Sequence, residues 1–190
     1  MGVVAYAFLA TRTPTKNRPQ DERSFQIKYG TKRESNEHSL WQDRLGLFTT
    51  LLIGIDPEEG FFVAADPVLH SPTKFYIRLE FKDRHADEIK RSGWHAWERD
   101  RRAGNTHPIE VLVGGTKDSL LDLIRFERAA LGLAPGDRHL LAERPNQFGA
   151  LSSAASSESK EAGLLHPLAA ELNLSPSEIL DLIAAARRLK

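Results

Sequence analysis

Apolar and polar side chains alternate without a break along residues 75–82, whose sequence is FYIRLEFK. Every second residue from Phe75 to Phe81 is apolar, and the residues between and after them are polar. Successive side chains of a β-strand point to opposite faces of its sheet, so this pattern predicts a strand with one buried face. The opposite face then presents a polar row, made of Tyr76, Arg78, Glu80 and Lys82.

The same patterning along the rest of the chain predicts an α+β (mixed α/β) fold. Its central sheet is expected to be mostly antiparallel, with two helices packed against it. The predicted strands are residues 3–9, 24–29, 48–55, 61–65, 75–82 and 108–113, and the predicted helices are residues 86–102 and 116–131. From residue 48 onward the expected order of elements is therefore βββαβα.

Composition divides the chain into three parts. Residues 1–143 carry the predicted strands and helices and are expected to form the α+β domain. Residues 144–162 are rich in Ser and Ala, which is typical of a linker. Residues 163–190 have helical periodicity and a capping box at residues 175–178, with Pro176 at the first helical position. They predict a helical hairpin that begins a further domain.

Charge is distributed unevenly along the chain. The 190 residues carry 26 Lys and Arg and 26 Asp and Glu, so the formal net charge is zero and does not itself indicate nucleic-acid binding. Residues 12–33, however, hold seven basic side chains against Asp21 and Glu22. Because basic side chains neutralise phosphates, this segment predicts contact with double-stranded DNA, with a solvated loop as the alternative. The candidate DNA-binding residues here are Arg12, Lys16, Arg18, Arg23, Gln26, Lys28, Tyr29, Lys32 and Arg33.

Four side chains outside this segment complete the predicted DNA-binding surface. Tyr76 and Arg78 belong to the polar row of the alternating strand, and His85 follows that strand closely enough to contact a phosphate. Trp41 stands among charged residues, where an aromatic wall can stack on an extruded or modified base. The alternative for each of these residues is an ordinary exposed or packed side chain.

The helix expected at residues 86–102 carries Trp94 and Trp97 at a spacing of three. Residues three apart on a helix share a face, so we expect the two indoles to lie together. At least one of them is expected to pack in the core.

The chain contains no cysteine. This excludes disulfides, thiolate metal sites and a cysteine nucleophile, and it agrees with a cytoplasmic location. No apolar run approaches the ~20 residues of a membrane-spanning helix, and the N-terminus lacks the pattern of a secretory signal. We therefore expect a cytoplasmic protein with no membrane partner.

A second candidate site combines Asp66, at the end of an apolar run, with Glu80 and Lys82 of the polar row. Glu80 and Lys82 share one face of their strand, about 7 Å apart. An antiparallel neighbour that ends at Asp66 would bring a second carboxylate beside them. Carboxylates prefer a hard divalent ion such as Mg²⁺, which can activate water for phosphodiester hydrolysis. The alternative is a solvated strand face on which Arg78 and Glu80 pair.

These residues resemble the active site of the PD-(D/E)XK nuclease superfamily, to which many restriction endonucleases belong. The resemblance implies that Asp66, Glu80 and Lys82 are catalytic and that Asp66 and Glu80 hold Mg²⁺. The expected βββαβα order is also similar to the core of that superfamily. The Pro-Asp pair of the superfamily stands here in reverse order, as Asp66-Pro67.

The segments SFQIKYG, LLIGID, FVAADP, LEFK and GWHAWER resemble the N-terminal part of bacterial restriction-endonuclease-like proteins. This resemblance implies a duplex-DNA recognition domain of a restriction-modification enzyme, a DNA hydrolase, with a modified base as one candidate target. Two alternatives stay open. The domain could itself be the nuclease, and only then is Mg²⁺ expected, or it could be a structural domain that forms a homodimer through residues 163–190.

Overall fold

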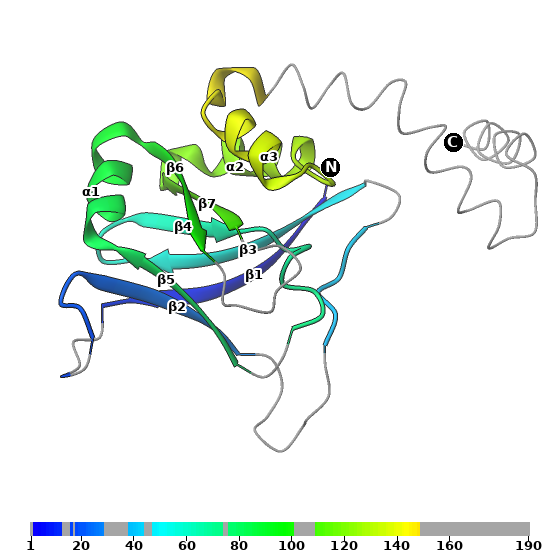
Figure 1. The fold of residues 1–190 in the computed structure, drawn as a ribbon. Coiled ribbons are helices and arrows are strands. Elements are labelled where there is room, and N and C mark those ends of the chain that lie inside the picture. The colour runs from blue at the N-terminus through cyan, green and yellow to red at the C-terminus, as the bar shows by residue number, and fades with distance from the viewer. Residues whose placement is uncertain are drawn as a thin grey trace, which may run out of the picture. The chain divides into compact units, whose positions relative to one another are not determined.

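The computed structural model describes residues 2–12, 16, 18–28, 38–43, 47–73, 76–100 and 109–148. The strands in this part of the chain form one curled sheet with the order β5-β2-β1-β3-β4-β7-β6 (Figure 1). Among these strands β1 and β3 run parallel, and all other neighbours run antiparallel. The strands are β1 (Gly2–Thr11), β2 (Glu22–Lys28), β3 (Phe48–Asp56), β4 (Phe61–Ala65), β5 (Tyr76–Lys82), β6 (Trp94–Asp100) and β7 (Ile109–Thr116).

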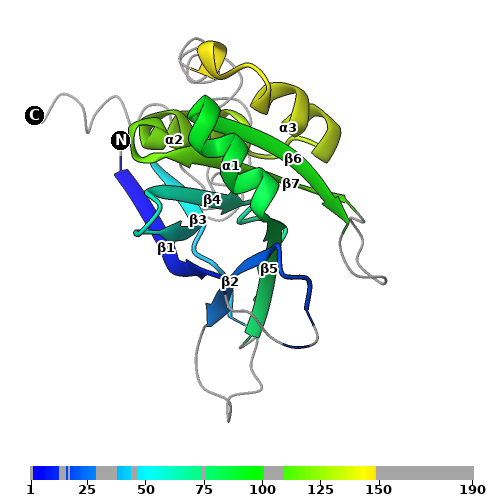
Figure 2. The same cartoon turned by 90° about the vertical axis from the view of Figure 1, so that its left-hand side faces the viewer.

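Three α-helices of the described residues cover the sheet from its two sides. One side is covered by α1 (Asp83–Ser92), which packs against β4, β5, β6 and β7 (Figure 2). The other side is covered by α2 (Leu120–Ala129) and α3 (Pro135–Ala142), which pack on β3, β6 and β7. None of these helices is long or apolar enough to cross a membrane. The predicted α+β fold, with a mostly antiparallel sheet and packed helices, is confirmed.

The middle of the sheet buries both of its faces. The inner face, around which the sheet curls, holds one apolar cluster that includes Phe25, Phe61, Leu79, Phe81, Ile89 and Trp97. The outer face holds a second cluster under α2 and α3 that includes Leu51, Ile53, Phe62, Leu123, Phe126 and Phe148. All five residues of β4, with the sequence FFVAA, are buried, because its alternate side chains enter one cluster or the other.

The outer face of the sheet is partly exposed along β1, which α2 and α3 do not cover. Along β1 the side chains alternate in exposure, and Val3 and Leu9 on the outer face are 41% and 67% exposed. Beyond β1 lie β2 and β5, whose inward side chains Phe25 and Leu79 are fully buried. The β2–β5 ribbon therefore closes the inner core with one face, and among the described helices neither α2 nor α3 is packed on the other face.

Gly54 of β3 allows this ribbon to curl over the inner core. A Cβ atom at position 54 would lie 2.3 Å from Cγ of Phe25, which comes from β2. Only glycine permits this approach, because any side chain would collide with the aromatic ring. The ring of Phe25 thus reaches the backbone of a strand that is two positions away in the sheet.

The helix expected at residues 86–102 is wrong in its second half. α1 ends at Ser92, and Gly93 adopts the left-handed conformation (φ 79°) while its N–H donates to the carbonyl of Ile89. This is a common way for a glycine to end a helix. The chain then continues as β6, so Trp94 and Trp97 lie on opposite faces of the sheet rather than together.

The order of elements after β5 also differs from the expected one. One strand and one helix were expected after α1. The structure has a β6–β7 hairpin followed by α2 and α3, so the order from β3 onward is βββαββαα. The helix expected at residues 116–131 begins with a short 3-10 turn, Lys117–Ser119, before α2. The helix α3 was not predicted, because Pro135 and Gly136 at its start are typical of a turn.

The domain boundary at residue 143, the linker at 144–162 and the helical hairpin at 163–190 stay predictions. Residues 149–190 lie outside the described residues. The described chain continues past residue 143 through a 3-10 turn, Pro145–Gln147, to Phe148. The ring of Phe148 is fully buried and lies 5.4 Å from that of Phe126, so the outer cluster includes this residue.

We predict that Gly54→Ala destabilises the fold by about 1–3 kcal/mol, because the added methyl group overpacks against Phe25. Gly136→Ala is the matched control, since no atom lies within 4 Å of a Cβ at that position of α3. This control should be neutral or stabilising by up to about 1 kcal/mol. Urea unfolding of both variants measures the difference, and equal stabilities would contradict the packing described here.

Candidate nucleic-acid interface

The outward face of the β2–β5 ribbon carries the polar row that the sequence predicts, and on it Ser24 is 4% exposed and the Arg78 side chain 8%. Across the two strands Gln26 lies opposite Arg78, Ser24 opposite Glu80, and Glu22 opposite Lys82. Because side chains alternate across each strand, all six point away from the buried Phe25 and Leu79. We call these six outward side chains the polar ribbon face. β5 is an edge strand, so this face lies at one border of the sheet.

Opposite charges alternate on and beside the polar ribbon face. The Arg78 guanidinium lies 2.8 Å from Glu22 and 2.9 Å from Glu80. At one end of the ribbon Lys82 donates to Asp21 at 3.0 Å, and this contact is largely exposed to solvent. Hydrogen bonding to Lys82 lowers the pKa of Asp21. The face is therefore a ladder of ion pairs, and its basic groups already have acidic partners.

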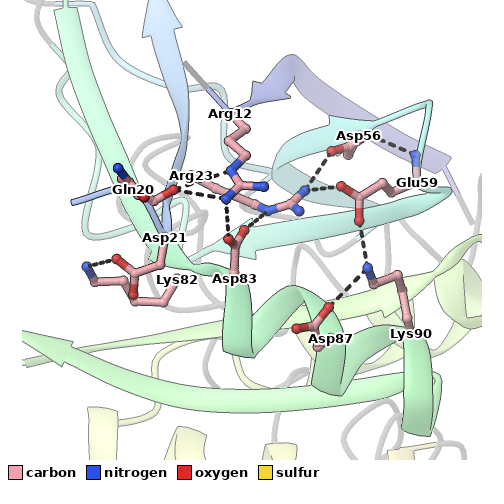
Figure 3. A network of polar contacts seen from close by, with 10 residues as sticks. All are labelled: Arg12, Gln20, Asp21, Arg23, Asp56, Glu59, Lys82, Asp83, Asp87 and Lys90. Carbon is pink, nitrogen blue, oxygen red and sulfur yellow. Dashed lines mark hydrogen bonds and ion pairs between the residues drawn. The ribbon is translucent and has the colours of Figure 1, made fainter. Parts of the chain in front are cut away.

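Arg23 points the other way, into the protein, and is not on this face. Its guanidinium contacts Asp83 of α1 at 2.6 Å, Asp56 of β3 at 3.2 Å, and Glu59 of the β3–β4 turn (Figure 3). The Arg23 side chain is only 7% exposed. Burial alone would lower the pKa of Arg23, but the carboxylates of Asp83 and Glu59 raise it. Arg23 thus ties β2 to β3 and to α1.

Arg12 extends the same network toward solvent. Its guanidinium contacts Asp83 at 2.9 Å and the backbone carbonyl of Gln20 at 3.1 Å. On the far side Lys90 of α1 reaches Glu59 at 2.7 Å, and Lys90 together with Arg23 lowers the pKa of that carboxyl (Figure 3). Several basic residues of the predicted DNA-binding surface are therefore held by carboxylates of this chain.

The remaining predicted DNA-binding residues fall into three groups. Lys16 and Arg18 are exposed, and Arg18 lies 3.9 Å from Glu22. Gln26 is half-buried on the polar ribbon face, and His85 is buried beside Trp97. Of Lys28 and Tyr76 the structure describes the strand backbone alone, and Tyr29, Lys32 and Arg33 lie outside the described residues.

Trp41 lies exposed beside Phe48, at the start of β3. The two rings meet edge to face at 5.6 Å, and they are 45% and 46% exposed. The backbone N–H of Trp41 donates to the Tyr6 hydroxyl at 2.9 Å, and the Thr50 hydroxyl donates to the Trp41 carbonyl at 2.7 Å. These bonds hold the segment against β1 and β3, so an aromatic surface is presented to solvent on a fixed backbone.

The structure does not bring Asp66 beside Glu80 and Lys82. The expected pairing of the strand that ends at Asp66 with the Glu80 strand is wrong, because β2, β1 and β3 stand between β4 and β5. Asp66 accepts from the N–H of Val68 at 2.8 Å and lies 3.8 Å from Arg138. In the described part of the chain, no three His, Asp or Glu side chains form a group that could hold a metal ion. These residues therefore do not fit a shared Mg²⁺ site, and their catalytic role stays a prediction.

Two clusters of buried ion pairs were not predicted from the sequence. Glu110 of β7 is fully buried between His70 at 2.6 Å and Arg99 at 2.8 Å. Burial raises the pKa of a carboxyl, but here His70 and Arg99 outweigh it and lower the pKa of Glu110. The only sequence signal is a Glu inside the apolar run IEVLVGG, which indicates a polar partner without naming it.

The second cluster joins α2 to α3. Arg138 contacts Glu127 at 2.6 Å, and its guanidinium lies 4.7 Å from the centre of the Phe126 ring. Burial raises the pKa of Glu127 to about 7, against the opposing effect of Arg138. Arg138 also lies 3.8 Å from Asp66, and this explains why the Asp66 carboxylate faces the helices rather than the polar ribbon face.

Comparison with protein-family models assigns this chain to a family. Residues 1–124 match the family model of Methylase-associated X1 (MTaX1). This match covers more than half of the 190 residues, so the chain belongs to the methylase-associated X1 family. The matched region begins with β1 and ends within α2, and it includes the polar ribbon face. Searches of curated proteins and of solved structures gave no significant match.

We predict that Arg23→Ala destabilises the fold by about 3–5 kcal/mol, because the buried carboxylate of Asp56 loses its ion pair with Arg23, while Asp83 keeps Arg12 and Glu59 keeps Lys90. Arg91→Ala is the control, since Arg91 is 77% exposed and pairs with Glu88 on the surface of α1. Such a surface pair contributes little to stability. Denaturant unfolding measures both variants. Equal effects would show that Arg23 is not the structural anchor described here.

Proposed function

We propose that this chain is a duplex-DNA recognition domain of a restriction-modification system. Membership of a methylase-associated family supports this context. The observation that carries the proposal is the polar ribbon face, a two-stranded antiparallel ribbon at the sheet border with outward Gln26, Arg78 and Lys82. The major groove of B-DNA is wide enough to admit such a ribbon.

Base recognition would use the pair that faces across the two strands. Arg78 can donate two hydrogen bonds to guanine, and Gln26 can bond the edge of adenine. The Arg78 side chain is 8% exposed and is held by Glu22 and Glu80 in the free protein, so DNA must both uncover the guanidinium and displace at least one carboxylate from it. This exchange favours targets that offer Arg78 an equally good acceptor, which is a source of selectivity.

Phosphate contacts would come from the exposed cations that flank the ribbon. Lys16 and Arg18 lie before β2, and Lys82 lies at the end of β5 with a partner, Asp21, that is itself exposed. Exposed ion pairs contribute little to stability, so exchanging a carboxylate for a phosphate costs little free energy. Lys28, Lys32 and Arg33 add positive charge to the sequence at the other end of β2.

A modified or extruded base would be held by Trp41. Its ring and that of Phe48 form an exposed aromatic pair on a backbone fixed to β1 and β3. Stacking on an aromatic ring contributes about 1–3 kcal/mol per base. A domain that works with a methylase would meet methylated bases on the same DNA, which favours a methylated base as the one that Trp41 holds.

We predict that the full chain shifts a duplex in a gel assay and that its affinity falls steeply with salt. Lys82→Ala and Lys16→Ala should each weaken binding and reduce the slope of log K against log salt by about 1. Lys117→Ala is the control, because Lys117 is 85% exposed in the 3-10 turn before α2, away from the ribbon. A missing or salt-independent shift would contradict the proposal.

We further predict that Gln26→Ala relaxes base preference without changing the salt slope. Losing one base contact should cost about 1–3 kcal/mol on the preferred sequence and nothing on sequences that lack that base. Selection from a random duplex library, with and without methylated bases, measures the preference. An unchanged preference would remove Gln26 from the recognition surface.

A further inference from the structure

Two histidines lie flat on one tryptophan where α1 meets β6. His85 Nδ1 lies 3.1 Å from His95 Nε2. The rings of His85 and His95 are within 21° of parallel, and their centres are 5.3 Å apart. Both stack on the indole of Trp97, with centre distances of 4.3 Å and 5.2 Å. The two imidazoles thus meet nearly edge to edge, in line with a direct hydrogen bond.

The neighbouring arginine fixes which nitrogens carry protons. Arg84 Nε lies 3.4 Å from His85 Nε2 and can only donate, so His85 Nε2 accepts. The proton of neutral His85 is therefore on Nδ1, which donates to Nε2 of His95. His95 then carries its own proton on Nδ1. The two hydrogen bonds, from Arg84 to His85 and from His85 to His95, require both imidazoles to be neutral, because each imidazole must accept one of them.

The surroundings oppose any added proton on the pair. Burial, the other histidine and Arg84 lower the pKa of His85 to about 4, and burial and Arg84 also lower the pKa of His95. The charged groups that face the pair are Arg84 and Glu88 on α1 and His139 on α3. Glu88 is the one group among these that favours protonation, and it is shared with Arg91 at 2.6 Å.

In the described part of the chain, the other elements packed against this site present uncharged residues to it. Gly114 of β7 lies opposite His95, and Phe81 of β5 lies 6.3 Å from the Trp97 ring. The side chain of Ile89, one turn further along α1, packs against Gly114. An imidazolium formed on His85 would therefore face Arg84 and a second histidine, and one formed on His95 would face Glu88 as its favourable charge.

We propose that the His85–His95 pair is a proton-operated latch that holds the start of α1 against β6. The neutral pair joins the two elements by one hydrogen bond and by a shared stack on Trp97. A proton added to either ring removes an acceptor and places a positive charge beside Arg84 or beside the other ring. The first turn of α1 then separates from β6, and this opening does not depend on DNA binding.

The direction of the pH dependence follows from the lowered pKa values. The closed latch binds protons less well than the open one, whose histidines titrate near the ordinary pKa of about 6.5. Closure is therefore complete at neutral pH and is lost as the pH falls from about 6.5 toward about 4.

Two-bond ¹H–¹⁵N spectra of the ¹⁵N-labelled full chain at neutral pH test the bonding pattern. We expect His85 and His95 as Nδ1–H tautomers. His70 should carry a proton on Nε2, since that nitrogen contacts the Glu110 carboxylate at 2.6 Å. Finding His85 as the Nε2–H tautomer would overturn the proposal.

Amide exchange along α1 tests the latch itself. Protection factors of its amides should fall by up to about tenfold per pH unit for each proton taken up, below about pH 6.5. His85→Phe keeps a ring on Trp97 and should weaken this dependence, because only His95 can then take up a proton. His139→Gln is the control, since the His139 ring pairs with Glu98 at 2.8 Å, and it should retain the full dependence. Wild-type protection that does not change with pH, or a His85→Phe profile like the wild type, would contradict the latch. If His85→Phe does not fold, the wild-type tautomers decide.

Discussion

One face of the β2–β5 ribbon must pack against the inner core, and the other face carries polar side chains. The rest of the structure depends on the packing of the first face. The inward face must fill the core with Phe25, Leu79 and Phe81, because α1 alone cannot cover the curled sheet. Gly54 admits Phe25, and Arg23 ties the ribbon to β3 and α1. The outward face carries the polar side chains, among which Ser24 and Arg78 are largely buried and Lys82 is reachable from solvent.

Internal charge pairing decides which basic residues can meet a polyanion. Arg23 is held by three carboxylates and is buried, so its charge serves the fold. Lys82 faces one exposed carboxylate and can exchange it. Because the ladder on the ribbon is close to neutral, binding to DNA would be an exchange of partners rather than a simple attraction. Such an interface depends on how well the DNA acceptors match the geometry of the basic side chains. It also avoids the strong non-specific attraction that a large positive charge would give.

Alternating patterns predicted the strands well, because burial of one strand face is a local property of the sequence. Residues 75–82 and the 48–65 hairpin illustrate this. The failure at residues 94–100 has a physical cause. Tryptophans at a spacing of three fit a helix, yet Gly93 in the left-handed conformation ends α1 and the following residues pair with β7. Both indoles then find separate cores, on opposite faces of the sheet.

The candidate site could be predicted only in part, since ion pairing and strand order join residues far apart in the chain. The polar ribbon face follows from alternation, but the partners of Arg23 lie 33 to 60 residues away. The separation of Asp66 from Glu80 depends on β1, β2 and β3 entering the sheet between β4 and β5. No local pattern specifies that order.

Backbone NMR of the full chain, titrated with a short duplex at low salt, tests the central claim most directly. If the polar ribbon face contacts DNA, the largest amide shifts should lie in β2 and β5 and near Trp41, and α2 and α3 should stay unchanged. Shifts gathered on α2 and α3, or no shifts at all, would contradict the assignment of this face to nucleic acid.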